Sequence, residues 1–177
     1  MRVIAGSLGG RRLVAPQGGG TRPTADRVRE AVFAILADVT DLSVLDLFAG
    51  SGALGIEALS RGAASATFVD NAAGSVAAVR ANLAALGLQG AEVRRGDARR
   101  FLRDARQAGR QYDLVFLDPP YREAAGLAGE LSQGLVSVLA PRARIVGESD
   151  RRAPLDLALP LRSERRYGDT LIRIHQP

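Results

Sequence analysis

The stretch VLDLFAGSGALG (residues 44–55) decides the fold of this chain. Residues 44–48 form a short apolar run that is typical of a buried strand, and residues 50–55 fit the pattern G-x-G-x-x-G ahead of a helical segment. Glycines at such a turn let the backbone approach a ligand at the helix N-terminus. The stretch therefore predicts a nucleotide-type binding turn, but the same pattern serves NAD, FAD and S-adenosylmethionine.

Apolar runs and amphipathic segments alternate on both sides of this turn. The pattern predicts helices at 52–61, 73–86, 98–108 and 123–139, and strands at 44–48, 66–70, 91–95, 114–117, 143–148, 155–159 and 170–175. Strand–helix alternation of this kind favours a parallel sheet with helices on both faces. We therefore expect an α/β fold with a doubly wound, mostly parallel sheet, whose ligand binds beyond the carboxyl ends of the strands.

The first 40 residues follow a different pattern. Residues 3–5 and 12–14, separated by Gly9-Gly10, predict a small hairpin, and residues 16–23 form a Gly/Pro-rich loop. Thr24 is a candidate N-cap for a helix at 25–37. The apolar stripe of that helix comprises Val28, Val32, Ile35 and Leu36. We divide the chain into an N-terminal hairpin, loop and helix extension (1–40) and a main domain (41–177).

Composition excludes several classes of site. The chain has no cysteine and a single histidine, His175, so disulfides, cysteine-ligated zinc and thiol nucleophiles are excluded, and we expect no metal. All 24 basic residues are arginine, and the net charge is +5. The positive charge is concentrated in residues 1–30, 94–110 and 142–166, which suits a polyanionic partner. Because no apolar run reaches about 18 residues, we expect a cytoplasmic protein that does not contact membranes.

Three acidic residues stand at the ends of predicted strands. Asp46 precedes the glycine turn, where a carboxylate can hold the ammonium of a bound amino acid. Asp70 follows the second strand, where it can accept hydrogen bonds from ribose hydroxyls, and Asp97 follows the third, within reach of an adenine amino group. S-adenosylmethionine carries these groups and no phosphate, whereas Asp46 would repel a pyrophosphate. Each acid alone also fits a helix N-cap.

Asp118-Pro119-Pro120-Tyr121 follows the fourth predicted strand. The two prolines lack N–H donors and hold the chain extended. The Asp118 carboxylate and the Pro119 carbonyl then form a rigid pair of acceptors beside the flat ring of Tyr121. Such a set suits a planar group with an exocyclic amine, because accepting both N–H bonds turns the nitrogen lone pair towards a methyl donor. The alternative is a proline-capped strand end.

This tetrapeptide resembles the motif of the amino-group methyltransferases in the S-adenosylmethionine-dependent Rossmann-like superfamily. More narrowly, the chain resembles the RsmD family over nearly its full length. The matching segments are RVIAG (2–6) with GRRL (10–13), RPTADRVREA (22–31), VLDLFAGSGALGIEALSRGA (44–63) and YGDT (167–170). Ser7 departs from the family pattern, which has a basic residue there.

The resemblance implies a seven-stranded sheet whose last strand is antiparallel. It also implies methyl transfer from S-adenosylmethionine to N2 of a guanine, position 966, in 16S rRNA of the small ribosomal subunit, by a monomer. Catalytic residues would be Asp118, Pro119, Pro120 and Tyr121. The cofactor would contact Asp46, Phe48, Ala49, Gly50, Ser51, Gly52, Asp70, Asn71, Asp97, Ala98 and Asp118. RNA would contact Arg11, Arg12, Arg22, Thr24, Arg27, Arg29 and Tyr121.

Other functions remain open from the residues alone. An NAD-dependent oxidoreductase would leave residues 118–121 unexplained. An adenine or cytosine amino-methyltransferase shares this motif but commonly carries an added target-recognition region, and a glutamine methyltransferase usually has Asn in place of Asp118. A non-catalytic ribosome assembly factor is a further alternative. The helical stripe Arg99, Arg103, Arg106 and Arg110 fits a solvated face or phosphate contacts; Tyr167 fits the core or a substrate contact, and His175 has no expected role.

Overall fold

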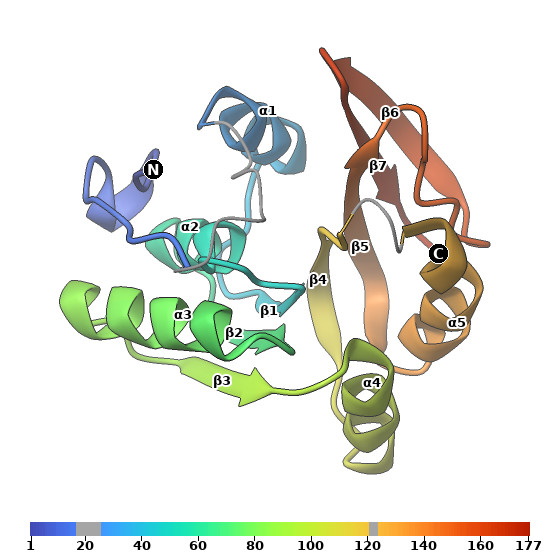
Figure 1. The fold of residues 1–177 in the computed structure, drawn as a ribbon, viewed down its shortest axis with the longest axis horizontal. Helices are drawn as coiled ribbons and strands as arrows, with labels where there is room; N and C mark the ends of the chain where they lie inside the picture. The colour runs from blue at the N-terminus through green and yellow to red at the C-terminus, as the bar shows by residue number, and fades with distance from the viewer. Residues whose placement is uncertain (17–25, 121–123) are drawn as a thin grey trace.

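The computed structural model describes residues 1–16, 26–120 and 124–177 (Figure 1). Its centre is a seven-stranded sheet in the order β3-β2-β1-β4-β5-β7-β6. The neighbours from β3 to β5 are parallel, and β7 is antiparallel to both β5 and β6, which confirms the expected fold class. The strands are β1 (Ser43–Leu47), β2 (Ser65–Asp70), β3 (Ala91–Arg95), β4 (Tyr112–Leu117), β5 (Leu139–Asp150), β6 (Leu161–Tyr167) and β7 (Thr170–His175).

Helices cover both faces of the sheet. Figure 1 shows α1, α2 and α3 on one side and α4 and α5 on the other. Their bounds are α1 (Asp26–Leu36), α2 (Ala53–Ser60), α3 (Ala73–Leu86), α4 (Ala98–Gln107) and α5 (Ala124–Val136). Each side has its own apolar core. On the first side, α1 packs on the sheet through the rings of Phe33 and Phe116, whose centroids are 5.7 Å apart.

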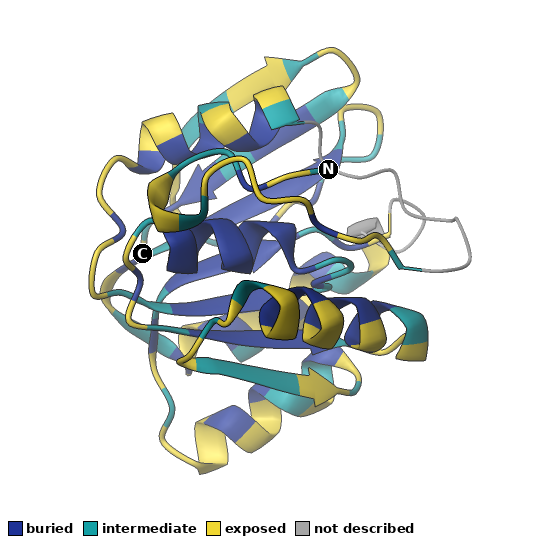
Figure 2. Cartoon of the chain, turned by 90° about the vertical axis from the view of Figure 1, so that its left-hand side faces the viewer, coloured by how far each residue is buried: buried dark blue, intermediate teal, exposed yellow. Residues whose placement is uncertain are grey.

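The N-terminal segment covers α2, and every residue of that helix is buried (Figure 2). The predicted hairpin is reduced to a single antiparallel bridge between Arg2 and Arg12, with a 3₁₀ turn (Gly6–Leu8) between them. In α1, Phe33 takes the place in the buried stripe that was predicted for Ile35, which is 39% exposed. Thr24, the predicted N-cap, lies outside the described residues.

The largest differences from the prediction in the C-terminal half are at β5 and β6. Residues 155–159 form a loop instead of the predicted strand. The strand in this part of the chain is β6, which begins at Leu161 and pairs antiparallel with β7. The apolar residues of that loop, Leu155 and Leu157, are buried against the core on the α5 side, so their alternation reflects packing and not ladder pairing. β5 begins at Leu139, earlier than predicted, because a register shift near Pro141 lets the strand continue past a residue that cannot donate a ladder hydrogen bond.

Within the described ranges, no helix combines the length and apolar character needed to cross a membrane. The same ranges contain no cluster of three His, Cys, Asp or Glu side chains suited to a metal ion.

Candidate active site

The order of the strands reverses between β1 and β4, and three acidic residues meet at the carboxyl ends of the strands there. Asp46 of β1 lies opposite Phe68 of β2 and Phe116 of β4. Residues two apart on a strand share a face of the sheet. Asp70 and Asp118 therefore lie on the same face as Asp46, two residues nearer the carboxyl edge of the sheet. This face is the one covered by α1, α2 and α3.

A fourth acid continues this line on β5. Leu117 of β4 lies opposite Gly147, so Glu148 takes the next position along β5, level with Asp118. Val146, two residues before Glu148, packs in the core on the α1–α3 side, so Glu148 faces that side as well. Glu148 is 5% exposed. We call Asp70, Asp46, Asp118 and Glu148 the carboxylate row, because they cross four adjacent strands.

Asp46 is held between the sheet and the start of α2. Its Oδ2 accepts a hydrogen bond from the backbone N–H of Gly55 at 3.0 Å. Burial, with a smaller contribution from the charge of Asp70, raises the pKa of Asp46 to about 8. A Cβ atom at Gly55 would lie 2.4 Å from the Phe68 ring, so the last glycine of the motif allows α2 to approach the sheet. The strand and helix together keep the Asp46 carboxyl away from water.

Asp70 shapes the glycine turn between β1 and α2. Its Oδ2 accepts from the Gly50 N–H at 2.9 Å, and its Oδ1 accepts from the Ala72 N–H at 2.8 Å. Phe48 and Gly50 both adopt left-handed conformations, with φ of 64° and 56°. A Cβ atom at Gly50 would meet only the Phe48 carbonyl, at 4.0 Å, so the turn presents its backbone to open space. A ligand can therefore approach the backbone at Gly50.

The other residues expected at the cofactor lie at the same edge. Ala49, Ser51 and Gly52 continue the turn, where Gly52 N–H donates to the Ala49 carbonyl at 2.7 Å. Asn71 is exposed immediately after β2, and Ala98 is buried at the start of α4. The backbone fold thus brings the predicted cofactor residues to one edge of the sheet.

Asp97 takes the helix-capping role that the sequence left open. Its carboxylate accepts from the backbone N–H groups of Arg99 and Arg100 at 3.0 and 3.1 Å, which caps α4. Hydrogen bonding from the Arg99 guanidinium is the main cause that lowers the pKa of Asp97. Arg99 also contacts Glu130 of α5. Much of the acceptor capacity of Asp97 is therefore used within the protein.

Asp118 follows β4 and precedes Pro119, which is buried, and Pro120, which is exposed. Desolvation by the surrounding protein raises the pKa of Asp118, and the charges of Glu148 and Asp46 raise it further. In the described part of the chain, Asp46, Asp70 and Asp118 have no basic ion-pair partner. Among the described residues these three carboxyl groups therefore have no cation of their own, which suits them to a cationic ligand. Tyr121 lies outside the described residues.

The arginines predicted to contact RNA divide into three groups. Arg11, Arg12 and Arg27 are exposed, and Arg11 also donates to the Ala85 carbonyl at 3.3 Å. Arg29 is fully buried and donates to the Arg2 carbonyl and to Asp26, so its prediction as a surface contact is wrong. It faces inward because it shares the face of α1 that buries Val32, Phe33 and Leu36, at helical spacing from each. Arg22 and Thr24 lie outside the described residues.

The orientation of α1 follows from contacts at its C-terminal end. Arg144, near the start of β5, donates to the carbonyls of Leu36 and Asp38. The end of α1 therefore lies at the amino edge of the sheet. Its beginning, with the exposed Arg27, points to the carboxyl edge that carries the carboxylate row.

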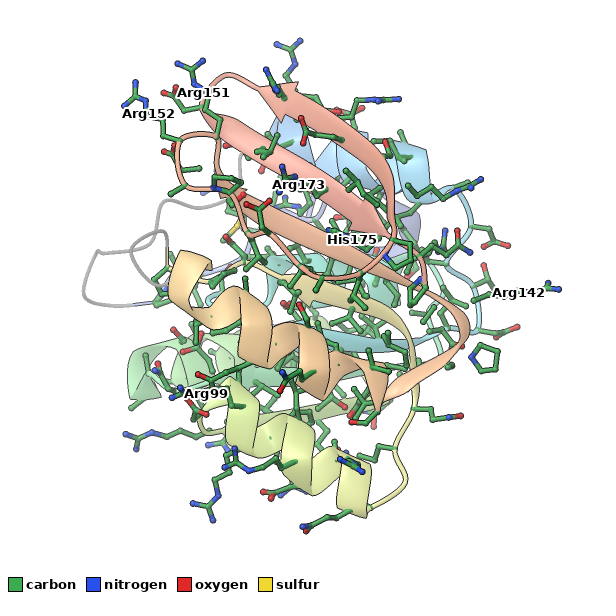
Figure 3. The ribbon with its side chains drawn as sticks, turned by 90° about the vertical axis from the view of Figure 1, so that its right-hand side faces the viewer. Arg99, Arg142, Arg151, Arg152, Arg173 and His175 are labelled. Carbon is green, nitrogen blue, oxygen red and sulfur yellow. The ribbon has the colours of Figure 1, made fainter. Side chains whose placement is uncertain are left out.

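The third basic block is split between the two edges of the sheet. Figure 3 shows Arg151 and Arg152 at one end and Arg142 at the opposite end. Arg151 and Arg152 follow the carboxyl end of β5; Arg151 pairs with Asp169 at 3.3 Å, and Arg152 has no ionic partner among the described residues. Arg151 and Arg152 therefore lie at the edge of the candidate site.

The remaining residues singled out in the sequence are mainly structural. Of the four arginines of the predicted helical stripe, Arg99 pairs with acids, and Arg103 and Arg106 are exposed. Arg110 follows the end of α4 and pairs with Glu92. Tyr167 is partly buried against the core on the α1–α3 side. His175 is 3% exposed, and its Nδ1 lies 3.0 Å from the Leu159 carbonyl oxygen.

Sequence reasoning missed the polar residues that hold the N-terminal segment to the site. Asn82 of α3 exchanges two hydrogen bonds with the backbone of Val14 and donates to the Ser51 carbonyl in the glycine turn at 2.9 Å. Glu57 of α2 accepts from the N–H groups of Ile4 and Ala5. The side chains of Asn82 and Glu57 are buried. For both Asn82 and Glu57, a polar residue on an otherwise apolar helix face is the sequence pattern that could have predicted such a buried contact.

Comparison with known proteins finds a family model and relatives that match most of this chain. A family model described as conserved hypothetical protein 95 matches residues 1–176. The Bacillus subtilis protein YlbH is 40% identical over 181 residues, which cover 99% of this chain and 98% of that protein. Ribosomal RNA small subunit methyltransferase D of Escherichia coli is 46% identical over 123 residues, 69% of this chain and 61% of that protein.

Solved structures agree with these sequence relatives. The structure of Escherichia coli yhhF superimposes with a TM-score of 0.85 at 39% identity and covers 99% of this chain and 97% of that one. The shared architecture therefore includes the N-terminal segment and the β6–β7 hairpin as well as the central sheet.

Proposed function

Because this chain belongs to the RsmD family, whose model is described as conserved hypothetical protein 95, we propose that it methylates N2 of a guanine in 16S rRNA. The methyl donor in this proposal is S-adenosylmethionine, and the family target is guanine 966 of the small ribosomal subunit. The name of the Escherichia coli relative supports small-subunit rRNA as the substrate. The chemistry of the site supports the cofactor and the amine acceptor.

The carboxylate row carries the proposal. Asp46, Asp70 and Asp118 bring three carboxyl groups to the switch point of the sheet, beside a glycine turn whose backbone faces open space at Gly50. Acidic side chains fit an ammonium and a sulfonium and reject a pyrophosphate. When bound, S-adenosylmethionine supplies a methyl group activated by its positively charged sulfur.

Each cofactor-binding residue then has a defined task. Asp46 would hold the ammonium. Each carboxylate oxygen of Asp70 already accepts one backbone N–H of the turn and would use its remaining lone pair to accept from a ribose hydroxyl. Asp97 would reach the adenine amino group only with acceptor capacity left over from capping α4. Phe48, Ala49, Gly50, Ser51, Gly52, Asn71 and Ala98 would form the surrounding wall.

Asp118 and Pro119 would hold the amine that receives the methyl group. The carboxylate of Asp118 accepts one N–H and the Pro119 carbonyl the other, and Pro120 keeps the chain extended. Tyr121 would stack on the base. A guanine can reach these acceptors only when it is unpaired or flipped out of its helix. No metal or covalent intermediate is needed, because the chain contributes positioning and charge.

The exposed arginines at the carboxyl edge would bind the surrounding phosphates. Arg27 at the start of α1 and Arg151 and Arg152 after β5 provide this charge at that edge, and Arg11 and Arg12 of the N-terminal segment would add further contacts to RNA. Arg22 and Thr24 belong to the same proposal by family resemblance. We further propose that the protein acts as a monomer in the cytoplasm on the assembled or assembling small subunit.

The test is methyl transfer from labelled S-adenosylmethionine to small ribosomal subunits of a strain that lacks this protein, beside naked rRNA and DNA. Nucleoside analysis should find N2-methylguanosine in the subunits. Asp118→Ala should abolish turnover and leave the cofactor Kd within a few fold, while Asp104→Ala, an exposed position on α4, should retain full activity. Label in DNA, N6-methyladenosine in any substrate, or no transfer at all would overturn the proposal.

A further inference from the structure

We propose that Glu148 selects guanine by accepting the N1–H of the target base while Asp118 accepts from its N2 amine. The inference rests on the proposed function and goes beyond it, because it names the residue that distinguishes guanine from other bases that carry an amine. Its foundation is the position of Glu148 in the carboxylate row, next to the acceptor pair formed by Asp118 and Pro119.

The register of β4 and β5 sets the distance scale between the two carboxylates. Leu117 is level with Gly147, so Asp118 and Glu148 are adjacent positions on neighbouring parallel strands. Neighbouring strands lie about 4.8 Å apart. On guanine, the N1–H and the N2 amine are neighbouring donors on one edge, because N1 and N2 are both bonded to C2. Two carboxylates one strand apart can therefore converge on these two donors.

The surroundings of Glu148 are unusual for a carboxylate. Glu148 is 5% exposed, and it follows the apolar residues Ile145 and Val146 on a central strand. Its charge raises the pKa of Asp118, so the two groups interact electrostatically. A carboxylate offers about four lone-pair positions. Glu148 can thus contact a neighbouring protein group and still accept a donor from a base.

Guanine is the base that matches two acceptors side by side. Its N1 carries a hydrogen and its N2 carries two, so the edge presented to the carboxylates consists of donors. Adenine presents an N1 lone pair, which would face the lone pairs of Glu148. A buried acceptor left without its donor costs about 1–3 kcal/mol, and a site built to hydrogen-bond one group rejects analogues that lack it.

The test uses the proton on N1 as the variable. Small subunits are reconstituted from ligated 16S rRNA that carries guanine, 2-aminopurine or 6-thioguanine at the mapped target position. 2-Aminopurine keeps the amine but has a lone pair at N1, whereas 6-thioguanine keeps the N1–H and changes only the atom on C6. The wild-type protein should methylate guanine and 6-thioguanine, and its kcat/KM on 2-aminopurine should be lower by on the order of 10- to 100-fold.

Glu148→Gln should relax this selectivity, because the amide N–H₂ can donate to the lone pair on N1 of 2-aminopurine. The guanine to 2-aminopurine ratio of kcat/KM should fall by about 10-fold or more in this variant. Glu130→Gln, the same substitution on the exposed face of α5, should leave the ratio unchanged. Cofactor Kd and the melting temperature verify that each variant is folded.

Three results would overturn the inference while leaving the proposed function intact. The first is efficient methylation of 2-aminopurine by the wild-type protein, which requires no variant to fold. The second is an unchanged base ratio in a folded, cofactor-binding Glu148→Gln variant. The third is rejection of 6-thioguanine together with 2-aminopurine, which would assign selectivity to the group on C6. Absence of N2-methylguanosine with the wild-type protein would instead overturn the proposed function itself.

Discussion

The affinity for S-adenosylmethionine should increase steeply with pH, because Asp46 must lose a proton to hold the ammonium. Its pKa is raised to about 8, mainly by burial. The groups that face it are the Gly55 N–H of α2 and the carboxylates Asp70 of β2 and Asp118 of β4. Among the described residues, none of these neighbours carries a positive charge. Below pH 8 the carboxyl is therefore mostly protonated until a cation arrives.

The magnitude follows from linkage between proton release and binding. The apparent Kd equals the intrinsic Kd multiplied by one plus ten to the power of pKa minus pH. With a pKa of about 8, this factor is about 100 at pH 6, about 11 at pH 7 and about 2 at pH 8. The cofactor should therefore bind about 50-fold more tightly at pH 8 than at pH 6. At pH 7, binding should release about 0.9 proton from this carboxyl.

Isothermal titration calorimetry in buffers of different ionisation enthalpy measures both quantities. Asp46→Asn replaces the carboxyl by an amide that does not titrate, so it should bind weakly at every pH and lose most of the dependence. The matched control Asp104→Asn, at an exposed position, should reproduce the wild-type curve. A slope of log Kd against pH that is steeper than one between pH 6 and 7 would indicate that Asp118 also loses a proton when the cofactor binds. A Kd that stays within about twofold from pH 6 to 8 would refute this reasoning.

Three further predictions concern stability. Because the native pKa of Asp46 is higher than its unfolded value of about 3.9, the native state binds more protons, and the free energy of unfolding without cofactor should fall between about pH 4 and 8 and level off above it; urea titrations of Asp46→Asn should show a smaller slope, because Asp118, whose pKa is also raised, still contributes. Asn82→Ala removes three hydrogen bonds made by a buried side chain and should lower stability by about 1–3 kcal/mol, whereas the exposed Gln107→Ala should change it by less than about 0.5 kcal/mol; equal midpoints would contradict the role of Asn82. Gly55→Ala places a methyl group against the Phe68 ring and should lower the melting temperature through overpacking of about 1–3 kcal/mol; an unchanged melting temperature would show that α2 can move away.

The sequence predicted most elements because local and tertiary signals agreed. The glycine that ends α3, Gly87, adopts a left-handed conformation at the predicted place. Prediction failed where packing overrode the local pattern. Residues 155–159 read as a strand because Leu155 and Leu157 alternate, yet a loop can bury alternate residues without a ladder partner.

The site was partly predictable for a related reason. Acids at strand ends are visible in sequence, and Asp46, Asp70 and Asp118 meet at one edge because parallel strands align their carboxyl ends. Sequence could not separate capping from ligand contact at Asp97, because both use a carboxylate after a strand. It could not place Glu148 either, because its partner position depends on the register between β4 and β5.

Arg29 shows how charge in a sequence differs from charge on a surface. It belongs to the basic block 1–30, yet it is fully buried on the inner face of α1, where burial lowers the pKa of its guanidinium. Its Nη2 donates to the Arg2 carbonyl and to Asp26, so it joins α1 to the N-terminal segment. Asn82 and Glu57 join that same segment to the glycine turn and to α2.

These contacts define how the N-terminal region relates to the cofactor edge. Val3 and Leu13 of the N-terminal segment and Val28 and Val32 of α1 belong to the same apolar core as the sheet. The extension therefore has no separate core, and its exposed arginines are fixed relative to the carboxylate row. In the proposed function, a positive rim held around a row of carboxyl groups would separate two tasks: the rim would attract phosphates, and the row would accept a cationic cofactor and the donor edge of a base. The same carboxyl groups would disfavour phosphate, so the proposed RNA substrate would enter the site by presenting a base.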